Sequence, residues 1–194
     1  MKLHLGCSDN LMIGYTNVDI LSECPAPLPD GALYQQADLN APWPWEDSSV
    51  DQIQAFDVFE HLTGPGPQNR GKVWVMNESW RVLKPGGKLI FGVPCVYLSD
   101  GRVNPGAFAD PTHATYWTLD DAFYFGSQFN TREFERGRLG DAYGIKAVFE
   151  FPPAIQMAAG WTWRCRNGLG WELLSYGKGS EQRSKIMAAL RAVK

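Results

Sequence analysis

Lys-Leu-His-Leu-Gly-Cys-Ser-Asp-Asn at residues 2–10 and Gly-Tyr-Thr-Asn-Val-Asp-Ile at residues 14–20 decide the fold of this chain. The pattern predicts a strand, a glycine turn and a second strand that ends on Asp19. Gly6 allows the backbone to turn sharply and to approach a ligand closely. In an open α/β sheet, the loop after the first strand and the acid that ends the second strand face the same crevice. The stretch therefore predicts a site for an adenosine-type ligand, with the Asp19 carboxylate accepting hydrogen bonds from ribose hydroxyls.

The connection between these two strands is unusually short. A parallel crossover that contains a helix needs a dozen or more residues, and the segment between Gly6 and Asp19 barely supplies them. We expect a single helical turn in this crossover, or none.

Composition restricts the class of protein. A chain of 194 residues is long enough for one domain with a substantial core and too short for two ordinary domains. The net charge of −3 gives no global signal for nucleic-acid binding. The four cysteines form no Cys-x-x-Cys pair, which argues against a zinc ribbon or a disulfide framework and favours a reducing compartment. With no signal-peptide pattern and no apolar run long enough to cross a bilayer, a cytoplasmic location is expected.

The remaining chain alternates between predicted strands and crossovers. A helix is expected over 68–83, stopped by Lys-Pro-Gly-Gly at 84–87, and a shorter helix over 119–125. The tail from Ser180 is predicted to be helical. Strands are expected at 33–37, 52–57, 88–93, 145–151 and 171–176. The predicted fold class is α/β: one doubly wound, mostly parallel, seven-stranded Rossmann-like sheet with an antiparallel last strand and helices on both faces.

Three further blocks carry a family resemblance. Asp38-Leu39 follows the third expected strand, and Phe-Asp-Val-Phe-Glu-His-Leu at 56–62 follows the fourth. Trp-Arg-Val-Leu-Lys-Pro-Gly-Gly at 80–87 precedes the fifth. Together with residues 2–20, these blocks resemble class I S-adenosylmethionine-dependent methyltransferases, and in particular the small branch of type-11 methyltransferases. We expect residues 1–194 to form a single methyltransferase-like domain.

The resemblance implies a cofactor and a set of residues that contact it. The cofactor would be S-adenosyl-L-methionine, which leaves as S-adenosyl-L-homocysteine. Asp19 would bind the ribose, and Asp38 would accept a hydrogen bond from the adenine amino group. The family usually has an acid where His4 stands and glycines where Ser8 and Asn10 stand. The implied cofactor-binding residues are Gly6, Cys7, Ser8, Asp19, Ile20, Asp38, Leu39, Phe56 and Asp57.

The acceptor site has to be built from residues beyond the fifth strand. Residues 94–118 are the predicted acceptor-site insertion, and its Ala-Asp-Pro-Thr-His at 109–113 also resembles the same branch. The segment Trp161-Thr162-Trp163 is a second candidate contributor. His113 is the predicted general base, because histidine titrates near neutrality and transfer to a hydroxyl requires removal of a proton. Its alternative role is to fix the loop by hydrogen bonds.

Two more residues near the fourth strand have competing interpretations. Asp57 is a catalytic candidate beside the methyl donor, or alternatively a residue that caps a turn. His61 is expected to be structural and to pack beneath the site, as the Glu-His pair often does in the resembling family. His4, His61, His113 and the cysteines lack the spacing of metal ligands, so no metal is predicted.

The predicted partner is a small-molecule acceptor. Basic residues in the last part of the chain favour an anionic acceptor, although such residues also occur on ordinary solvated surfaces. No nucleic-acid or membrane partner is predicted, and the oligomeric state is left open. The basic residues are Arg164, Arg166, Lys178, Arg183, Lys185 and Arg191.

The predicted function is methyl transfer from S-adenosylmethionine to an unidentified small molecule. A nicotinamide dehydrogenase would need Gly-x-Gly-x-x-Gly opening a full helix and a later acid than Asp19. A DNA amino-methyltransferase would need Asn/Asp-Pro-Pro-aromatic after the fourth strand, where residues 57–60 read Asp-Val-Phe-Glu. The alternative from another class is a degenerate methyltransferase fold that binds a ligand or partner without turnover.

Overall fold

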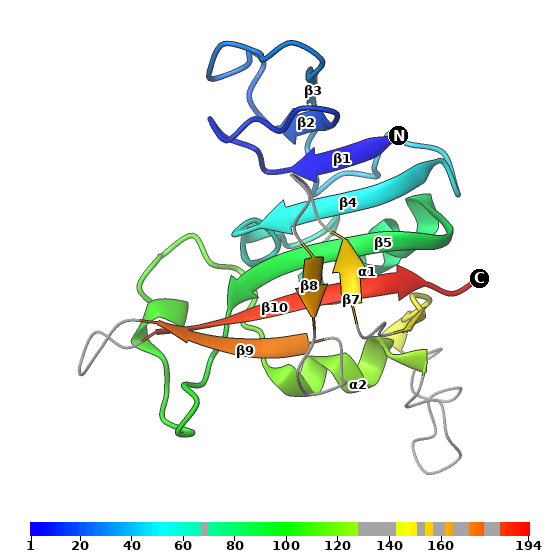
Figure 1. Cartoon of the computed structure of the whole chain (residues 1–194). Coiled ribbons are helices and arrows are strands. Elements are labelled where there is room, and N and C mark those ends of the chain that lie inside the picture. The colour runs from blue at the N-terminus through cyan, green and yellow to red at the C-terminus, as the bar shows by residue number, and fades with distance from the viewer. Residues whose placement is uncertain (67–69, 128–142, 151–153, 157–161, 165–170, 177–182) are drawn as a thin grey trace.

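The computed structural model describes residues 1–66, 70–127, 143–150, 154–156, 162–164, 171–176 and 183–194 (Figure 1). The strands are β1 (Lys2–Leu5), β2 (Thr16–Asp19), β3 (Leu33–Gln36), β4 (Val50–Phe56), β5 (Leu83–Pro94), β6 (Phe149–Glu150), β7 (Ala154–Gln156), β8 (Thr162–Arg164), β9 (Trp171–Tyr176) and β10 (Arg183–Ala192). The helices are α1 (Gly71–Val82) and α2 (Ala122–Phe125), with 3-10 turns η1 (Phe59–His61), η2 (Pro105–Ala107) and η3 (Leu119–Asp121).

The main sheet has the order β3-β2-β1-β4-β5-β10-β6, and β9 also pairs with β10. Strands β1 to β5 are parallel, with Leu5 opposite Val18 on one side and opposite Ala55 on the other. Strand β10 runs antiparallel to β5, with Ile186 opposite Val93. The predicted α/β class, with a mostly parallel sheet and an antiparallel last strand, is confirmed.

One face of the sheet carries the main hydrophobic core. Side chains from its strands, such as Leu5 and Phe91, pack with Val75 and Met76 of α1 and with Phe125 of α2. Within the described ranges, α1 and α2 are the α-helices, and both contribute to this same cluster. On the other face, the β7–β8 hairpin crosses in front of the sheet in Figure 1, and β7 contacts β10.

The opposite face of β1, β2 and β4 is buried but polar. The Tyr15 hydroxyl accepts hydrogen bonds from the side-chain amides of Gln52 and Gln54, at 2.8 and 2.6 Å. His4 is 2% exposed, and its Nδ1 lies 3.1 Å from the amide oxygen of Asn17. Burial lowers the pKa of His4, so the imidazole is held neutral and Nδ1 is the donor in this pair. His4 therefore has a structural role at the position where the resembling family has an acid.

The prediction of a helical tail from Ser180 is wrong. Residues 183–192 form β10, which lies between β5 and the pair β6 and β9. Alternate residues Ile186, Ala188 and Leu190 enter the main core, while Ala189 packs with Ile90 on the other face. Alanine, leucine, arginine and lysine favour a helix locally, but pairing on both edges and burial of both faces override that weak preference.

The other helix and strand boundaries differ less from the predicted ones. The strand expected to begin at 88 begins at Leu83, so Lys-Pro-Gly-Gly lies within β5, at a register shift opposite β4. Helix α1 begins at Gly71 and ends at Val82 because Leu83 is already extended. Of the strand expected over 145–151, the structure contains Phe149–Glu150, with residue 151 outside the described residues. The strand at 171–176 and the short helix near 119–125 are confirmed.

The shortened first crossover is also confirmed, because residues 6–15 between β1 and β2 contain no helix. Cys7 N–H donates to the Val18 carbonyl and Asn10 N–H to the Cys7 carbonyl, so the loop folds back at once on the strand pair. The expectation of a single domain over 1–194 stays a prediction.

A polar cluster fixes the Trp-Pro-Trp loop to α1. The Arg81 guanidinium donates to both carboxylate oxygens of Glu78, at 2.8 Å each, and to the carbonyls of Trp43 and Trp45. Trp43 N–H donates to Glu78 at 2.9 Å. Arg81, which belongs to the sequence block at 80–87, therefore holds the Trp-Pro-Trp loop against α1.

None of the helices in the described ranges has the length and apolar character needed to cross a membrane.

Candidate functional site

The glycine turn after β1 has little freedom to change. Gly6 has a φ of 62°, and a Cβ atom added there would lie 2.6 Å from a methyl carbon of Val58. A side chain at this position would therefore be strained and would push Val58 away. Ser8, where the resembling family has glycine, also lies in the left-handed region, with a φ of 44°. The turn conformation is thus retained although the second glycine is replaced.

Asp19 is held against this turn by two backbone donors. Its Oδ2 accepts from Ser8 N–H at 2.9 Å, and its Oδ1 accepts from Leu21 N–H at 3.3 Å. Each carboxylate oxygen can accept more than one hydrogen bond. Asp19 is half-buried, so capacity remains on the side that faces solvent.

These elements surround a pocket of about 340 Å³ at the carboxyl ends of β1, β2 and β4. It is lined by Gly6, Asp19, Ile20, Ala37, Asp38, Leu39, Asn40, Asp57, Val58, His61 and Leu62. Six of the residues predicted to contact the cofactor are in this lining: Gly6, Asp19, Ile20, Asp38, Leu39 and Asp57. The structure therefore brings together residues that the sequence blocks had placed separately.

Three predicted cofactor residues do not line the pocket. The Cys7 side chain is buried, and burial together with nearby Asp19 raises the pKa of its thiol to about 11, so it stays protonated. Ser8 is exposed and contributes its N–H to Asp19. Phe56 packs with Ile90 and Ala189.

Asp57 follows β4 with a φ of 55°, a conformation that aspartate tolerates better than most residues. Its carboxylate pairs with Lys185 of β10, and its side chain is 52% exposed. Asp57 therefore lies between β10 and the pocket of about 340 Å³, which we call the donor pocket. Its catalytic role stays a prediction.

Glu60 is the most buried carboxyl group near the pocket, at 1% exposure. Its Oε2 atom has no hydrogen-bond partner among the described residues. The pKa of Glu60 is raised to about 7, mainly by burial and also by the neighbouring Asp57 and Asp110, against the opposing effects of its own backbone N–H and of Lys185. A buried acceptor without a partner is uncommon in proteins and calls for an explanation.

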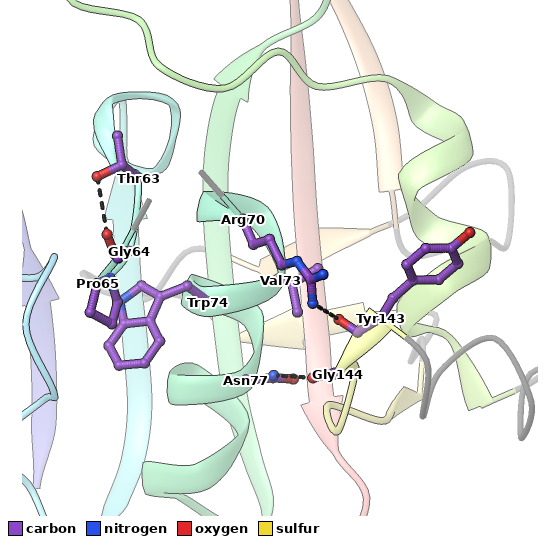
Figure 2. Close-up of a pocket in the computed structure, with 10 residues that line it drawn as sticks. Thr63, Gly64, Pro65, Arg70, Val73, Trp74, Asn77, Tyr143 and Gly144 are labelled. Atoms are coloured by element: carbon purple, nitrogen blue, oxygen red, sulfur yellow. Dashed lines mark hydrogen bonds between the residues drawn. The ribbon is translucent and has the colours of Figure 1, made fainter. Parts of the chain in front are cut away.

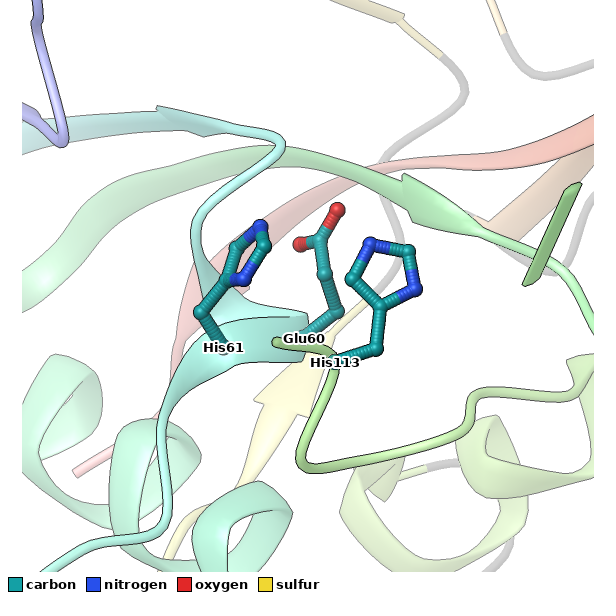
Figure 3. Close-up of side chains that lie close together, drawn as sticks. All are labelled: Glu60, His61 and His113. Carbon is teal, nitrogen blue, oxygen red and sulfur yellow. The ribbon is translucent and has the colours of Figure 1, made fainter. Parts of the chain in front are cut away.

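His61 and His113 lie on either side of this carboxyl group (Figure 3). Their ring centroids are 4.9 Å apart in an edge-to-face arrangement. One potential ligand atom from each of Glu60, His61 and His113 lies within 4.8 Å of the other two. Sequence analysis missed this cluster because its members come from η1 and from the loop after β5, far apart in the chain.

Hydrogen bonds determine the tautomers of both histidines. His113 Nδ1 lies 2.8 Å from the Ala107 carbonyl, which can only accept, so Nδ1 carries the proton. The Thr112 hydroxyl donates to Asp110 at 2.6 Å, so it can only accept from His61 Nδ1 at 2.9 Å. In the neutral form of each ring, the lone pair is therefore on Nε2.

The predicted acceptor segment 94–118 packs against η1. Ala114 and Thr115 both donate backbone N–H groups to the Glu60 carbonyl, at 2.8 and 2.9 Å. Asn104 is buried and ties the segment to the sheet, donating to the carbonyls of Cys95 and Ser184. The segment thus positions His113 against His61, which lines the pocket, and its role as the acceptor-site insertion stays a prediction. Trp161 lies outside the described residues.

A second pocket, of about 410 Å³, lies between the loop after η1 and helix α1 (Figure 2). Its polar groups are occupied by local contacts: Arg70 donates to the Tyr143 carbonyl, and Asn77 donates to the Gly144 carbonyl. None of the predicted cofactor or catalytic residues lines it. It is larger than the first pocket, but it brings together no titratable cluster.

Two of the basic residues in the last part of the chain form ion pairs. Lys185 pairs with Asp57, and Arg191 pairs with Glu150. Arg166 and Lys178 lie outside the described residues. The pair with Glu150 favours an ordinary solvated-surface role for Arg191. Lys185 lies beside the pocket, because its partner Asp57 is part of the pocket lining.

Residues 15–91 match the family model described as a methyltransferase domain. Over these residues the chain is therefore similar to methyltransferases of the type-11 kind, in agreement with the resemblance of its sequence blocks. Its matched part contains Asp19, Asp38, Asp57 and the Glu60-His61 pair. A search of curated proteins finds no match.

Solved structures of methyltransferases share this fold. An S-adenosylmethionine-dependent methyltransferase from Mesorhizobium loti is 13% identical with a TM-score of 0.54, covering 98% of this chain and 90% of that one. The N-methyltransferase NodS from Bradyrhizobium japonicum, in complex with S-adenosyl-l-homocysteine, is 11% identical with a TM-score of 0.52, covering 100% and 78%. A chain from the complex between the Haloferax volcanii Trm112 methyltransferase activator and its partner is 14% identical with a TM-score of 0.54, covering 100% of this chain and 82% of that one. At these identities the likeness concerns the fold.

Proposed function

We propose that this protein transfers a methyl group from S-adenosylmethionine to a small-molecule acceptor. The observation that carries the proposal is that Gly6, Asp19, Asp38 and Asp57, predicted from separate sequence blocks, line one pocket. The methyltransferase family match, and a similar fold that was solved with S-adenosyl-l-homocysteine, support S-adenosylmethionine as the cofactor. When bound, this cofactor supplies a methyl group made electrophilic by a sulfonium.

The pocket residues fit such a molecule. The Asp19 carboxylate, already fixed by two backbone donors, accepts hydrogen bonds from the ribose hydroxyls with its remaining lone pairs. Asp38 is exposed at the end of β3 and has one oxygen engaged by Asn40 N–H, which leaves the other for the adenine amino group. The absence of a side chain at Gly6 lets the backbone approach the ligand, since a Cβ there would already meet Val58.

The acceptor binds on the side of the pocket formed by η1 and residues 94–118. Rate enhancement comes from holding the acceptor atom in line with the methyl carbon, because orientation supplies a large part of the acceleration in bimolecular reactions. As the acceptor atom bonds to the methyl carbon, the carbon–sulfur bond breaks and its electron pair stays on sulfur. A hydroxyl acceptor must also lose a proton, and the Nε2 lone pair of His113 is available to accept it.

Calorimetric titration with S-adenosylhomocysteine tests this function. We expect micromolar binding by the wild-type protein and no heat with NAD. Asp19→Asn should weaken binding by about tenfold or more, because hydrogen bonds to a charged group contribute about 1.5–3 kcal/mol. Asp9→Asn, in the same loop but exposed, is the matched control and should bind as the wild type does.

Two outcomes would contradict the proposal or its enzymatic part. No binding of S-adenosylhomocysteine by folded protein would contradict the proposed cofactor. Binding that is followed by no production of S-adenosylhomocysteine from the donor, across hydroxyl, amine and thiol acceptors, would favour the alternative of a fold that binds without turnover.

A further inference from the structure

We propose that Glu60, His61 and His113 form a binding site for a divalent first-row transition-metal ion at the edge of the donor pocket. The three side chains converge from η1 and from the loop after η2 (Figure 3). One ligand atom from each lies within 4.8 Å of the others. Two imidazoles and one carboxylate are a ligand set typical of zinc, manganese, iron or cobalt sites that keep coordination positions open.

The unpaired carboxylate oxygen is the first independent observation that points to a ligand. Glu60 is 1% exposed, and its Oε2 has no hydrogen-bond partner in the described part of the chain. Leaving a buried acceptor unpaired destabilises the folded state. Coordination to a cation would offset this cost, whereas a purely structural glutamate at this position would be expected to have a donor within reach.

The hydrogen bonds of the two histidines are the second observation. Metal-binding histidines almost always donate their other ring N–H to a carbonyl, a carboxylate or a related acceptor, which fixes the ring. His113 donates Nδ1–H to the Ala107 carbonyl, and His61 donates Nδ1–H to Thr112, whose hydroxyl is bonded to Asp110. Both rings are thus already held in the tautomer that leaves Nε2 free for an ion.

The location gives the ion a role that rests on the proposed methyl transfer. His61 belongs both to this cluster and to the lining of the donor pocket. An ion held there would bind an acceptor through oxygen and lower the pKa of its hydroxyl. His113 would then act as a ligand, and the hydroxyl proton would leave to solvent. The acceptor class is accordingly a small molecule with a hydroxyl able to coordinate the ion.

The test is titration of chelator-treated, full-length protein with Co²⁺ and with Zn²⁺, monitored by visible absorption and by calorimetry. We expect one equivalent to bind, with much weaker binding of Mg²⁺, which prefers oxygen ligands. Glu60→Gln and His113→Ala should each weaken binding by about tenfold or more. The chain has three histidines, so His4→Asn is the matched control and should bind like the wild type.

Each contrary outcome would overturn the metal site. These are the absence of binding by folded wild-type protein, equal loss of binding in His4→Asn, or a thiolate-to-cobalt charge-transfer band that places the ion on a cysteine. Circular dichroism on every variant confirms that the fold is retained. Titration of the same samples with S-adenosylhomocysteine separates this inference from the proposed function, because His113 does not line the donor pocket.

Discussion

Two glutamates are buried in the described part of the chain, and their surroundings differ in one decisive respect. Glu78, on α1, is 7% exposed and has both oxygens occupied by Arg81 and Trp43 N–H. Glu60, on η1, is 1% exposed and has an oxygen with no partner in the described residues. A carboxylate with a complete set of donors joins elements of the fold. One with an incomplete set costs stability, and we take that incompleteness as the mark of a ligand site.

We expect the largest effect on stability from removing Arg81, the cation that pairs with Glu78. Arg81→Ala leaves Glu78 buried without its main partner and frees the carbonyls of Trp43 and Trp45. We expect a loss of about 2–4 kcal/mol in the free energy of unfolding, measured by urea denaturation. Arg81→Lys keeps the charge without the fork geometry and should lose less. A loss below that of an ordinary surface substitution would contradict the joining role.

Replacing each of the two buried glutamates by glutamine compares their contributions to stability most directly. Glu78→Gln should cost about 1–3 kcal/mol, because two donors from Arg81 lose their charged acceptor. Glu60→Gln, measured in chelator, should cost much less or increase stability, since it removes a carboxylate whose buried oxygen has no partner among the described residues. Urea denaturation of the two variants side by side measures the difference. Equal losses would mean that Glu60 is as well satisfied as Glu78.

His4 extends the comparison to a buried histidine whose Nδ1 has a hydrogen-bond partner, the side chain of Asn17. Burial lowers the pKa of His4 below its ordinary value of 6.5. The protein therefore has the full stabilising contribution of neutral His4 above pH 6.5, and this contribution is lost as the pH falls through the lowered pKa. Thermal unfolding across this range should show a decline on acidification that is reduced in His4→Gln. An unchanged slope in the variant would assign the decline to other groups.

The smallest effect concerns two serines with left-handed backbone, one in the turn after β1 and one beside Arg81. Ser8 has a φ of 44° in the predicted cofactor turn, and Ser48 has a φ of 55° beside Arg81. Glycine adopts this conformation without strain, so Ser8→Gly should raise the free energy of unfolding by about 0.5 kcal/mol. Ser48→Gly should gain less, because it also loses the hydrogen bond from Lys194. Thermal denaturation resolves the order of the two, and a loss of stability in Ser8→Gly would show that the serine side chain stabilises the turn.

The elements around the donor pocket could be predicted because their signals are local. Gly6 with its left-handed φ, and Asp19 and Asp38 at strand ends, each follow from a few neighbouring residues. Strand β10 could not be predicted, because its strand conformation comes from pairing with β5 on one edge and with β6 and β9 on the other. Its local composition favours a helix.

The cluster at Glu60 could not be predicted for the same reason. His61 and His113 come together only when residues 94–118 pack on η1 through the Glu60 carbonyl. No spacing along the chain signals that contact. The nearest local signal was the Glu60-His61 pair itself, which the family resemblance had assigned to packing.

The most direct test of both proposed sites is a crystal structure of the protein grown with S-adenosylhomocysteine and Zn²⁺, with anomalous data collected at the zinc edge. We predict S-adenosylhomocysteine in the pocket between Gly6, Asp19 and Asp38, with its sulfur toward His61, and one anomalous peak among Glu60, His61 and His113. Density for the ligand in the pocket beside α1, or an empty donor pocket at saturating ligand, would contradict the proposed function. A zinc peak elsewhere with S-adenosylhomocysteine in place would contradict the metal site alone.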